Sequence, residues 1–512
     1  MTVRARWCAA AAVSLAAAQV LAQTATDAQP AAGHAVEAER AGADLPASWT
    51  PQPGGLTADR VARRAIASSL AVRAAHSNVD AAAAGRNEAA VAMIPQISVS
   101  ARYSRLSEIT PPSLNFSSLI PTFPFCVDGN GGLSVGLPSG STVLCPGSTR
   151  PLPSSSSSSS SGFSFPVILN NYALNATITV PLTDLPFRLA RVYEGAGLTE
   201  QARRLDEQSA RAQAGTDARI AFYEYLRAEG QLLAAQQGLE TAQRHQEDLR
   251  RFVEAGTMAR VDLLRVEAQA AEAERLVIGA QSALSLAETQ LRQRMHAPAS
   301  EQFVLGEAID GEEAGFVAVH TLIDRALASR PELQSLERQA GAIRESTSAT
   351  RAAMYPTVFG QFSVDAQNPN SRFFPASQEW NTTWTATVQA QWSPTSALVA
   401  NAQVNRLTAQ RQALLAQLDA VREGTEIEVR AAYISGTTSA AAIASARRQV
   451  IAAEESYRVR RERFQAGSAV SSDLTDAELD LLRARLALVN ARVDLREAQA
   501  RMHRAVGEAE PE

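Results

Sequence analysis

Apolar residues recur every seven positions in two distant parts of the chain, at a constant offset of 211 residues. A companion series, made mostly of Ala, runs beside each of them. This spacing predicts long helices that pack along a coiled-coil seam, and small Ala side chains let neighbouring helices approach closely. The two apolar series are Leu263, Ala270, Val277, Leu284 and Leu291, and then Leu474, Leu481, Leu488, Leu495 and Met502.

Each apolar series begins just after a glycine turn. Gly256 and Gly467 are each followed six residues later by an aspartate, Asp262 and Asp473. A glycine at this place ends one helix and turns the chain, and an aspartate in the first turn of the next helix is favourable there. The sequence therefore predicts two helical hairpins, with tips at residues ~255–261 and ~466–472.

Four other stretches alternate strictly between apolar and polar residues. In the first, Ile97, Val99, Ala101 and Tyr103 share one face, while the residues between them are polar. This period of two predicts strands with one apolar face. The predicted strands are ~96–105, ~171–181, ~357–365 and ~383–392.

The order of these elements indicates an internal duplication. Ala92-Met93-Ile94-Pro95 resembles Ala353-Met354-Tyr355-Pro356, at an offset of 261 residues. We expect a first repeat over 56–296, an equatorial segment over 297–317, a second repeat over 318–507 and a tail over 508–512. Each repeat is predicted to contain one helix before its strands (57–94 and 321–354) and a long helix after them (184–254 and 397–463).

The N-terminus has the features of a secretory signal peptide over residues 1–22. Arg4 and Arg6 precede an apolar run that is too short for a membrane span, and small residues precede Gln23. Residues 23–55 are rich in Ala, Pro and Gly, which predicts a disordered lead-in. The long polar loop over ~106–170 contains Cys126 and Cys145, and export to an oxidising compartment predicts a disulfide between them.

Composition adds little chemistry to this picture. The 48 basic residues, all of them Arg, and 53 acidic residues give no sign of nucleic-acid binding. The six histidines have no metal-ligand spacing, and no nucleophile or phosphate-loop motif is present. We expect neither an enzyme nor a cofactor or metal site.

Four strands with one apolar face are too few to close a barrel with a lumen, which needs about eight or more. Because lipid does not tolerate open sheet edges, several chains are expected to share one barrel. Strands of ~10 residues suit a bilayer crossing, so membrane lipid is an expected partner. Aromatic residues near strand ends suit interfacial girdles: Tyr103, Tyr172, Phe373, Phe374, Trp380 and Trp392. The alternative is a soluble sheet.

With its signal peptide, duplication, strand pairs and two Gly–x5–Asp–Leu tips, the chain resembles the TolC-like outer membrane efflux protein family over residues 56–507. The resemblance implies an α+β membrane protein in the outer membrane. A homotrimer would form a twelve-stranded β-barrel, continued by a twelve-helix periplasmic α-barrel with an equatorial belt.

The implied function is the exit duct of a tripartite efflux pump or type I secretion system. It would be a passive conduit, opened when a periplasmic adaptor and an inner-membrane transporter of the RND or ABC type dock. A periplasmic coiled-coil structural or adaptor protein without its own channel is the alternative.

Two aspartates in the second tip, Asp473 and Asp476, are the candidates for a gate. They lie three residues apart and therefore on one helix face, and either helix-dipole stabilisation or a pore role would explain them. The resemblance implies that they ring the periplasmic constriction.

The exposed turns are predicted to dock the adaptor, through Gly256, Thr257, Asp262, Leu263, Gly467, Ser468 and Leu474. Asp262 matches an acidic position that latches the tips in relatives. Its expected Arg partner is Ala469 here, and Phe464 stands where a Tyr is often found, so the resemblance leaves open how the tip is held shut.

Overall fold

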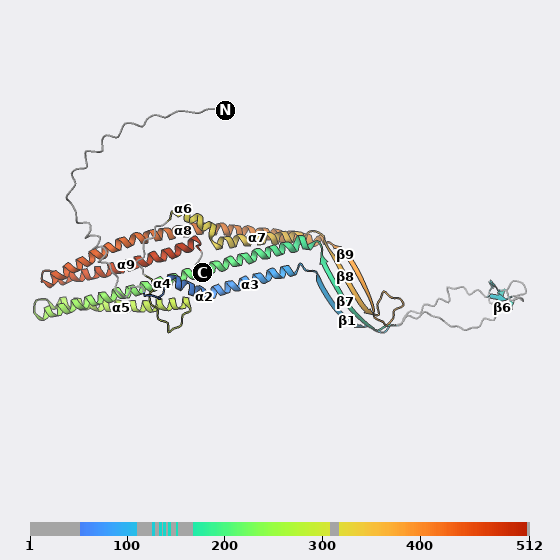
Figure 1. Cartoon of the computed structure of the whole chain (residues 1–512), viewed down its shortest axis with the longest axis horizontal. Helices are drawn as coiled ribbons and strands as arrows, with labels where there is room; N and C mark the ends of the chain where they lie inside the picture. The colour runs from blue at the N-terminus through green and yellow to red at the C-terminus, as the bar shows by residue number, and fades with distance from the viewer. Residues whose placement is uncertain are drawn as a thin grey trace, which may run out of the picture. The chain divides into compact units, whose positions relative to one another are not determined.

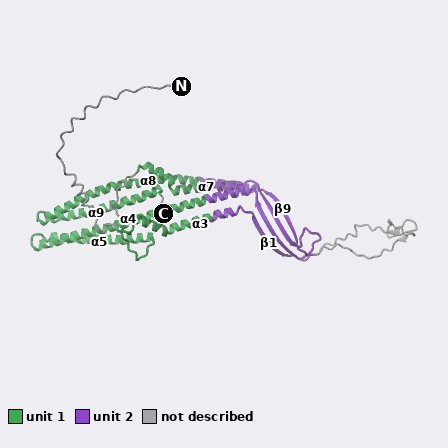
Figure 2. Cartoon of the chain, viewed as in Figure 1, with its two compact units in different colours: residues 1–83, 198–340, 412–512 green, residues 84–197, 341–411 purple. Residues whose placement is uncertain are grey.

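The computed structural model describes residues 52–109, 167–307 and 317–508, together with five short strands between residues 125 and 151. The chain folds into two compact units, of which unit 1 holds residues 1–83, 198–340 and 412–512 and unit 2 holds residues 84–197 and 341–411 (Figure 2). Helices and strands carry the labels of Figure 1. The predicted signal peptide lies outside the described residues.

A four-stranded antiparallel sheet is the main element of unit 2. Its strands are β1 (Gln96–Arg105), β7 (Asn170–Pro181), β8 (Thr357–Asn368) and β9 (Asn381–Gln391), and they lie in this order across the sheet (Figure 1). The register places Ile97 opposite Ile178, Ile178 opposite Phe362 and Phe362 opposite Ala386. The alternating apolar residues of all four strands therefore share one face.

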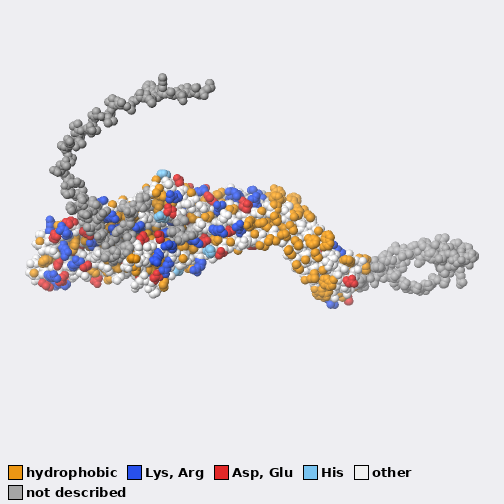
Figure 3. All heavy atoms as spheres, viewed as in Figure 1, with side chains coloured by type: hydrophobic (Ala, Val, Ile, Leu, Met, Phe, Trp, Pro, Cys, Tyr) orange, Lys and Arg blue, Asp and Glu red, His pale blue; other side chains and the backbone are white. Residues whose placement is uncertain are grey.

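The apolar face of this sheet is exposed in the single chain. Val99 and Val388 are 78% and 74% exposed, and Figure 3 shows hydrophobic side chains gathered over the strands. The opposite face carries hydrogen-bonded polar groups, such as the Asn175 amide, which donates to Asp365 at 2.6 Å. Among the described residues, β1 and β9 each pair on one edge only.

Short strands lie within the long first loop. They are β2 (Phe125–Val127), β3 (Leu133–Val135), β4 (Leu137–Ser139), β5 (Thr142–Leu144) and β6 (Arg150–Pro151). The predicted disulfide between Cys126 and Cys145 lies outside the side chains that the structure describes.

Four long helices form two hairpins. The first pairs α4 (Ala190–Glu254) with α5 (Arg260–Met295), and the second pairs α8 (Pro394–Gln465) with α9 (Ser471–Val506) (Figure 1). A five-residue π-helical turn, η3 (Leu185–Leu189), precedes α4, where the sequence predicts regular helix from 184 onward. Pro186 lies in this turn, and because proline has no backbone N–H to donate, it suits the start of a helix.

The helices before the strands are broken, which corrects the prediction of one helix each. The first is divided into α2 (Ala58–Ser68) and α3 (Leu70–Val91), and the second into α6 (Val319–Ser329) and α7 (Pro331–Ala352). Ser69 and Arg330 have extended backbones at the breaks. Pro331 disfavours helical geometry at Arg330. The break at Ser69 is explained by tertiary packing, because α2 packs its small residues against the end of α5.

Unit 1 also contains a short piece of belt where two backbone segments meet. Leu56 and Leu305 form a parallel bridge, and Gln52 N–H donates to the Leu305 carbonyl at 2.8 Å. A Cβ at Gly55 would lie 2.3 Å from the Leu305 oxygen, so only glycine fits there. Residues 52–55, which belong to the segment for which composition predicts disorder, thus take part in backbone contacts.

Candidate functional site at the hairpin turns

Both hairpin turns of unit 1 are built by the same local bonds. Gly256 and Gly467 have positive φ values of 74° and 70°, a conformation that glycine adopts without a Cβ penalty. The Thr257 hydroxyl donates to the Phe252 carbonyl at 2.9 Å. In the second turn, the Ser468 hydroxyl donates to the Arg463 carbonyl at 3.1 Å. The repeated sequence motif therefore encodes a repeated turn.

A cavity of about 660 Å³ lies between the two turns. Its walls include Phe252 and Met258 from the first hairpin and Val470 from the second. Asp262 also lines it, half-buried, at the start of α5. The predicted docking residues Gly256, Thr257, Gly467 and Ser468 are exposed beside this cavity.

A small apolar cluster supports the turns from beneath. It contains one fully buried residue from each long helix: Leu249, Val266, Phe464 and Leu474. Leu263, one of the predicted docking residues, is half-buried and packs against this cluster. Leu474 is 3% exposed, which corrects its assignment to the docking surface. A residue this buried positions the second turn and offers no side-chain surface to a partner.

Phe464, where the resemblance leads one to expect a tyrosine, is a core residue of the tip. Its ring meets Phe252 edge-on at 5.7 Å between centroids, and it is 1% exposed. Ala469 packs at the edge of the same cluster. The two departures from the family pattern thus enlarge the apolar part of the tip.

The two predicted gate aspartates are exposed on the first turns of α9. Within the described residues, neither the Asp473 nor the Asp476 carboxylate makes a hydrogen bond or ion pair. The nearest basic contact is to the backbone, where Arg460 donates to the Asp473 carbonyl at 2.9 Å. Val470, the residue that caps α9, gives no side-chain hydrogen bond. Both carboxylates are therefore free to face solvent or a pore.

Beneath this apolar cluster the structure shows a polar contact that the sequence pattern did not predict. His245 on α4 faces Glu478 on α9, with 3.2 Å between Nδ1 and Oε1. Both side chains are buried. One signal was available, because His245 lies four residues before Leu249 and Glu478 lies four residues after Leu474. Each polar residue therefore occupies the same helix face as a core residue.

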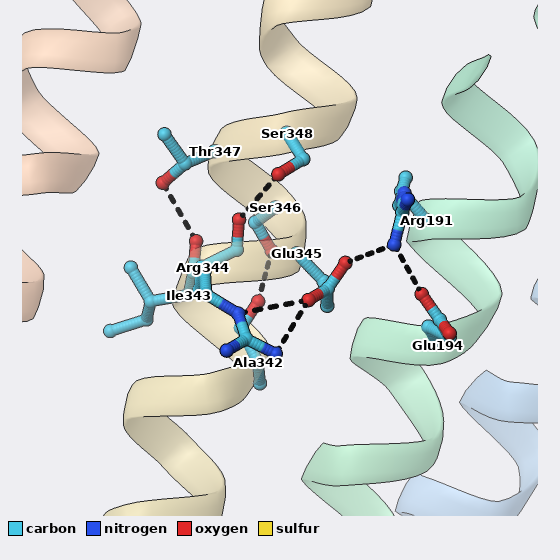
Figure 4. A network of polar contacts seen from close by, with 9 residues as sticks. All are labelled: Arg191, Glu194, Ala342, Ile343, Arg344, Glu345, Ser346, Thr347 and Ser348. Carbon is cyan, nitrogen blue, oxygen red and sulfur yellow. Dashed lines mark hydrogen bonds and ion pairs between the residues drawn. The ribbon is translucent and has the colours of Figure 1, made fainter.

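A second polar network lies in unit 2, where α4 and α7 run side by side (Figure 4). Arg191 donates to Glu194 at 2.9 Å and to Glu345 at 3.1 Å, and Arg344 lies 3.1 Å from the same Glu345 carboxylate. Hydrogen bonding to Glu345 raises the pKa of Arg191. The buried Glu345 carboxylate thus bridges two helices, which holds them together just before the strands begin.

Two further features bear on what the chain can do: the binding of a metal ion and the crossing of a membrane by a helix. Within the described part of the chain, no three His, Cys, Asp or Glu side chains gather as metal ligands would. In the same residues, no helix has the length and apolar character needed to cross a membrane.

The sequence model of the outer membrane efflux protein family matches residues 152–295 and 322–508, which together make up more than half of the chain. The chain belongs to the outer membrane efflux protein family. Membership places it in the outer membrane and among efflux channels, which are not enzymes. The alternative of a periplasmic adaptor without its own channel is therefore wrong. No curated protein sequence matches the chain significantly.

Solved outer membrane channels share the fold. OprN aligns with a TM-score of 0.68 and 17% identity, over 92% of this chain and 97% of that one. VceC of Vibrio cholerae aligns with a TM-score of 0.67 and 16% identity, over 88% of this chain and 96% of that one. The open state of MtrE of Neisseria gonorrhoeae aligns with a TM-score of 0.66 and 17% identity, over 88% of each chain. This helix-rich fold with a small antiparallel sheet is that of an outer membrane efflux protein.

Proposed function

We propose that three copies of this chain form an outer membrane duct that serves as the exit of a tripartite efflux pump or a type I secretion system. The observation that carries the proposal is the sheet of unit 2, which has one exposed apolar face and, among the described residues, two open edges. Lipid would cover the apolar face, and the edges of neighbouring copies would pair to close the barrel. Three copies would supply twelve strands.

The helices of unit 1 support the same assembly. Exposed apolar residues lie along α5, at Leu276, Ile278 and Leu286, and along α8, at Ile427 and Ile434. Helix α9 lies between α4 and α8. Arg227 of α4 pairs with Glu497 of α9 at 2.9 Å, and Arg485 of α9 pairs with Glu454 of α8 at 3.0 Å. The outermost helices α5 and α8 are thus the ones with apolar side chains left for neighbouring copies, as a twelve-helix periplasmic tunnel requires.

The hairpin turns are the proposed contact for a periplasmic adaptor. The cavity between them offers apolar side chains beside two exposed glycines, and glycine lets a partner backbone approach closely. An inner-membrane transporter, of the RND or ABC type, would supply the energy. Docking would move the turns apart, and the duct itself would stay passive.

The second turn is the proposed gate. Threefold symmetry would bring together Asp473 and Asp476 of each copy at the periplasmic end of the tunnel. Exposed carboxylates gathered in a narrow opening attract cations and repel anions.

The decisive experiment measures mass and conductance on the same preparation. We expect the detergent-solubilised protein to have the mass of a trimer by native mass spectrometry, and to form channels in planar bilayers. A monomeric mass together with the absence of channel events would overturn the proposal.

A further inference from the structure

One buried carboxylate differs from the others in the basic group that it faces. Among the described residues, four buried glutamates each make an ion pair with at least one arginine: Glu200, Glu207, Glu345 and Glu497. The fifth, Glu478, faces His245. Arginine keeps its charge at every physiological pH, whereas histidine generally changes its charge between about pH 5 and 8.

The pair links all four helices of the tip. The His245 side chain is 1% exposed, its Nε2 lies 3.4 Å from the Ser471 hydroxyl of α9, and its ring meets Phe464 of α8 edge-on at 5.2 Å. From α5, the Gln269 amide donates to Glu478 Oε2 at 3.4 Å. A change at this contact therefore reaches both hairpins.

The Glu478 carboxylate is incompletely compensated when His245 is neutral. Its donors are then an imidazole and an amide, both uncharged, which lie 3.3 and 3.4 Å from Oε2, and these distances are long for hydrogen bonds. Its Oε1 atom makes no hydrogen bond within the described residues. Burying a carboxylate without a charged partner is costly. A proton on His245 would turn the contact into a charge-assisted hydrogen bond, which is about twice as strong.

Tyr457 packs against the same apolar cluster, and the charged groups that act on it come from three of the four helices. Tyr457 of α8 has a pKa that is raised by burial, with a further contribution from the Glu478 charge, and Arg461, Arg244 and Arg485 oppose that shift. Arg244 lies on α4, Arg461 on α8 and Arg485 on α9, while α5 contributes the uncharged Gln269. These arginines keep their charge at every physiological pH.

We propose that His245 and Glu478 form a proton-sensitive link that holds the two hairpin turns together. Protonation of His245 strengthens the link as the pH falls, and the strengthening is lost as the pH rises and His245 gives up its proton. The link is a positioning pair, because it orients the start of α9, which carries Asp473 and Asp476. Only its consequence for conduction rests on the proposed function.

Hydrogen–deuterium exchange of the full-length protein tests the link without any need for channel activity. Exchange is measured at about pH 5.5 and pH 7.5, corrected for the intrinsic pH dependence, on peptides that cover both turns. We expect protection to rise several-fold at the lower pH, because a charge-assisted hydrogen bond is stronger than a neutral one. The variant His245→Gln should abolish the rise.

The control is His503→Gln, because His503 forms an exposed pair with Glu508 just beyond the other end of α9. This control should keep the parent's pH response. If His245→Gln does not fold, Glu478→Gln replaces it, and it should also give a flat response. Protection that is independent of pH in the parent, or an equal response in the His245 or Glu478 variant, overturns the link.

Conductance of the same proteins separates this inference from the duct proposal. We expect the parent to open less often at about pH 5.5 than at pH 7.5, and the His245→Gln protein to lose this difference. A pH response in exchange with no channel activity would overturn the duct and leave the link. Channel activity together with pH-independent exchange at the tip would overturn the link and leave the duct.

Discussion

Within one turn of helix at the second tip, neighbouring residues have opposite surroundings. Asp473 and Asp476 are exposed, and Leu474 between them is buried. This follows from the helix period of 3.6 residues, which places positions three apart on one face and the position next to them on another. The same period explains why Glu478 is buried four residues after Leu474.

The first prediction at the residue scale concerns the gate. The double variant Asp473→Asn, Asp476→Asn removes both carboxylates and keeps their size, so it should abolish cation selectivity if they line the constriction. The measurement is the reversal potential of single channels in a salt gradient. Asp480→Asn is the matched control, because Asp480 is exposed further along α9 and pairs with Arg483. A reversal potential equal to the parent's would show that the aspartates serve only the helix dipole.

The second prediction concerns Glu229 on α4. Burial raises the pKa of this carboxyl, and its Oε2 atom has no hydrogen-bond partner among the described residues. A raised pKa means that the folded protein binds the proton more tightly than the unfolded chain does, so stability falls as the pH rises through the folded-state pKa. Glu229→Gln should therefore raise the free energy of unfolding by roughly 1 kcal/mol at neutral pH.

The pH dependence provides the check on this second prediction. Thermal melting should show the gain of Glu229→Gln at about pH 7.5 and a smaller gain at about pH 4.5, where the parent carboxyl is increasingly protonated. Glu288→Gln is a control on α5, because Glu288 is an ion-pair partner of Arg292 and should lose stability when it is neutralised. An equal melting temperature for parent and Glu229→Gln at both pH values would contradict the argument.

At the scale of elements, two hairpins with the same apolar repeat are buried to different extents. The α9 positions Leu474, Leu481, Leu488, Leu495 and Met502 are all buried, whereas Val277 of α5 is only half-buried. Helix α9 has neighbours on both sides, and α5 lies at the edge of the row. Burial of a seam thus depends on what lies across from it, which the repeat itself does not specify.

The turns give the prediction for this scale. Replacing Gly256 and Gly467 by Leu strains both turns, since each glycine has a positive φ, at a cost of about 1 kcal/mol each, and it places bulk beside the cavity. We expect adaptor binding to weaken at least tenfold, as measured by surface plasmon resonance with the immobilised channel, while trimers persist.

Gly279→Leu is the matched control for the turn variants. Gly279 lies within α5, where its φ is not positive and an added Cβ would meet no atom within 4 Å. Wild-type adaptor binding by the turn variants, or an equal loss in the Gly279 variant, would count against docking at the turns.

At the scale of the whole molecule, the exposed apolar surfaces need a second and third copy. Ile278 of α5 is 60% exposed, and we expect a neighbouring copy to cover it. Ile278→Glu should then prevent trimer assembly, because it would bury an unpaired charge at the contact. Native mass spectrometry should show monomers for this variant and trimers for Ile278→Leu. Trimers in both would place the contact elsewhere.

The loop prediction also belongs to this scale. Cys126 and Cys145 should resist alkylation in the non-reduced protein and become reactive after reduction. Because the residues predicted to form the helix seams lie outside this loop, Cys126→Ser should leave the trimer intact. Alkylation of both thiols in the non-reduced protein would show that this disulfide is absent.

The sequence by itself determined the four strands of the sheet, the long helices and the two turns, because their patterns are local. Alternation of apolar and polar residues marks the strands that the structure places in one sheet, and a glycine followed by an aspartate marks both turns. These signals depend on a few neighbouring residues, through the helix and strand periods. The family could be recognised from the same patterns, since the order of elements is repeated twice along the chain.

Only the tertiary structure decided which side chains meet across the helices. The contact between His245 and Glu478 joins residues 233 positions apart, and no local pattern pairs them. Likewise, Leu474 and Leu263 occupy matching positions of the repeat, yet one is fully buried and the other half-buried. The break at Ser69 also depends on packing, against the end of α5. Burial is a property of distant partners, so the structure was needed to reveal it.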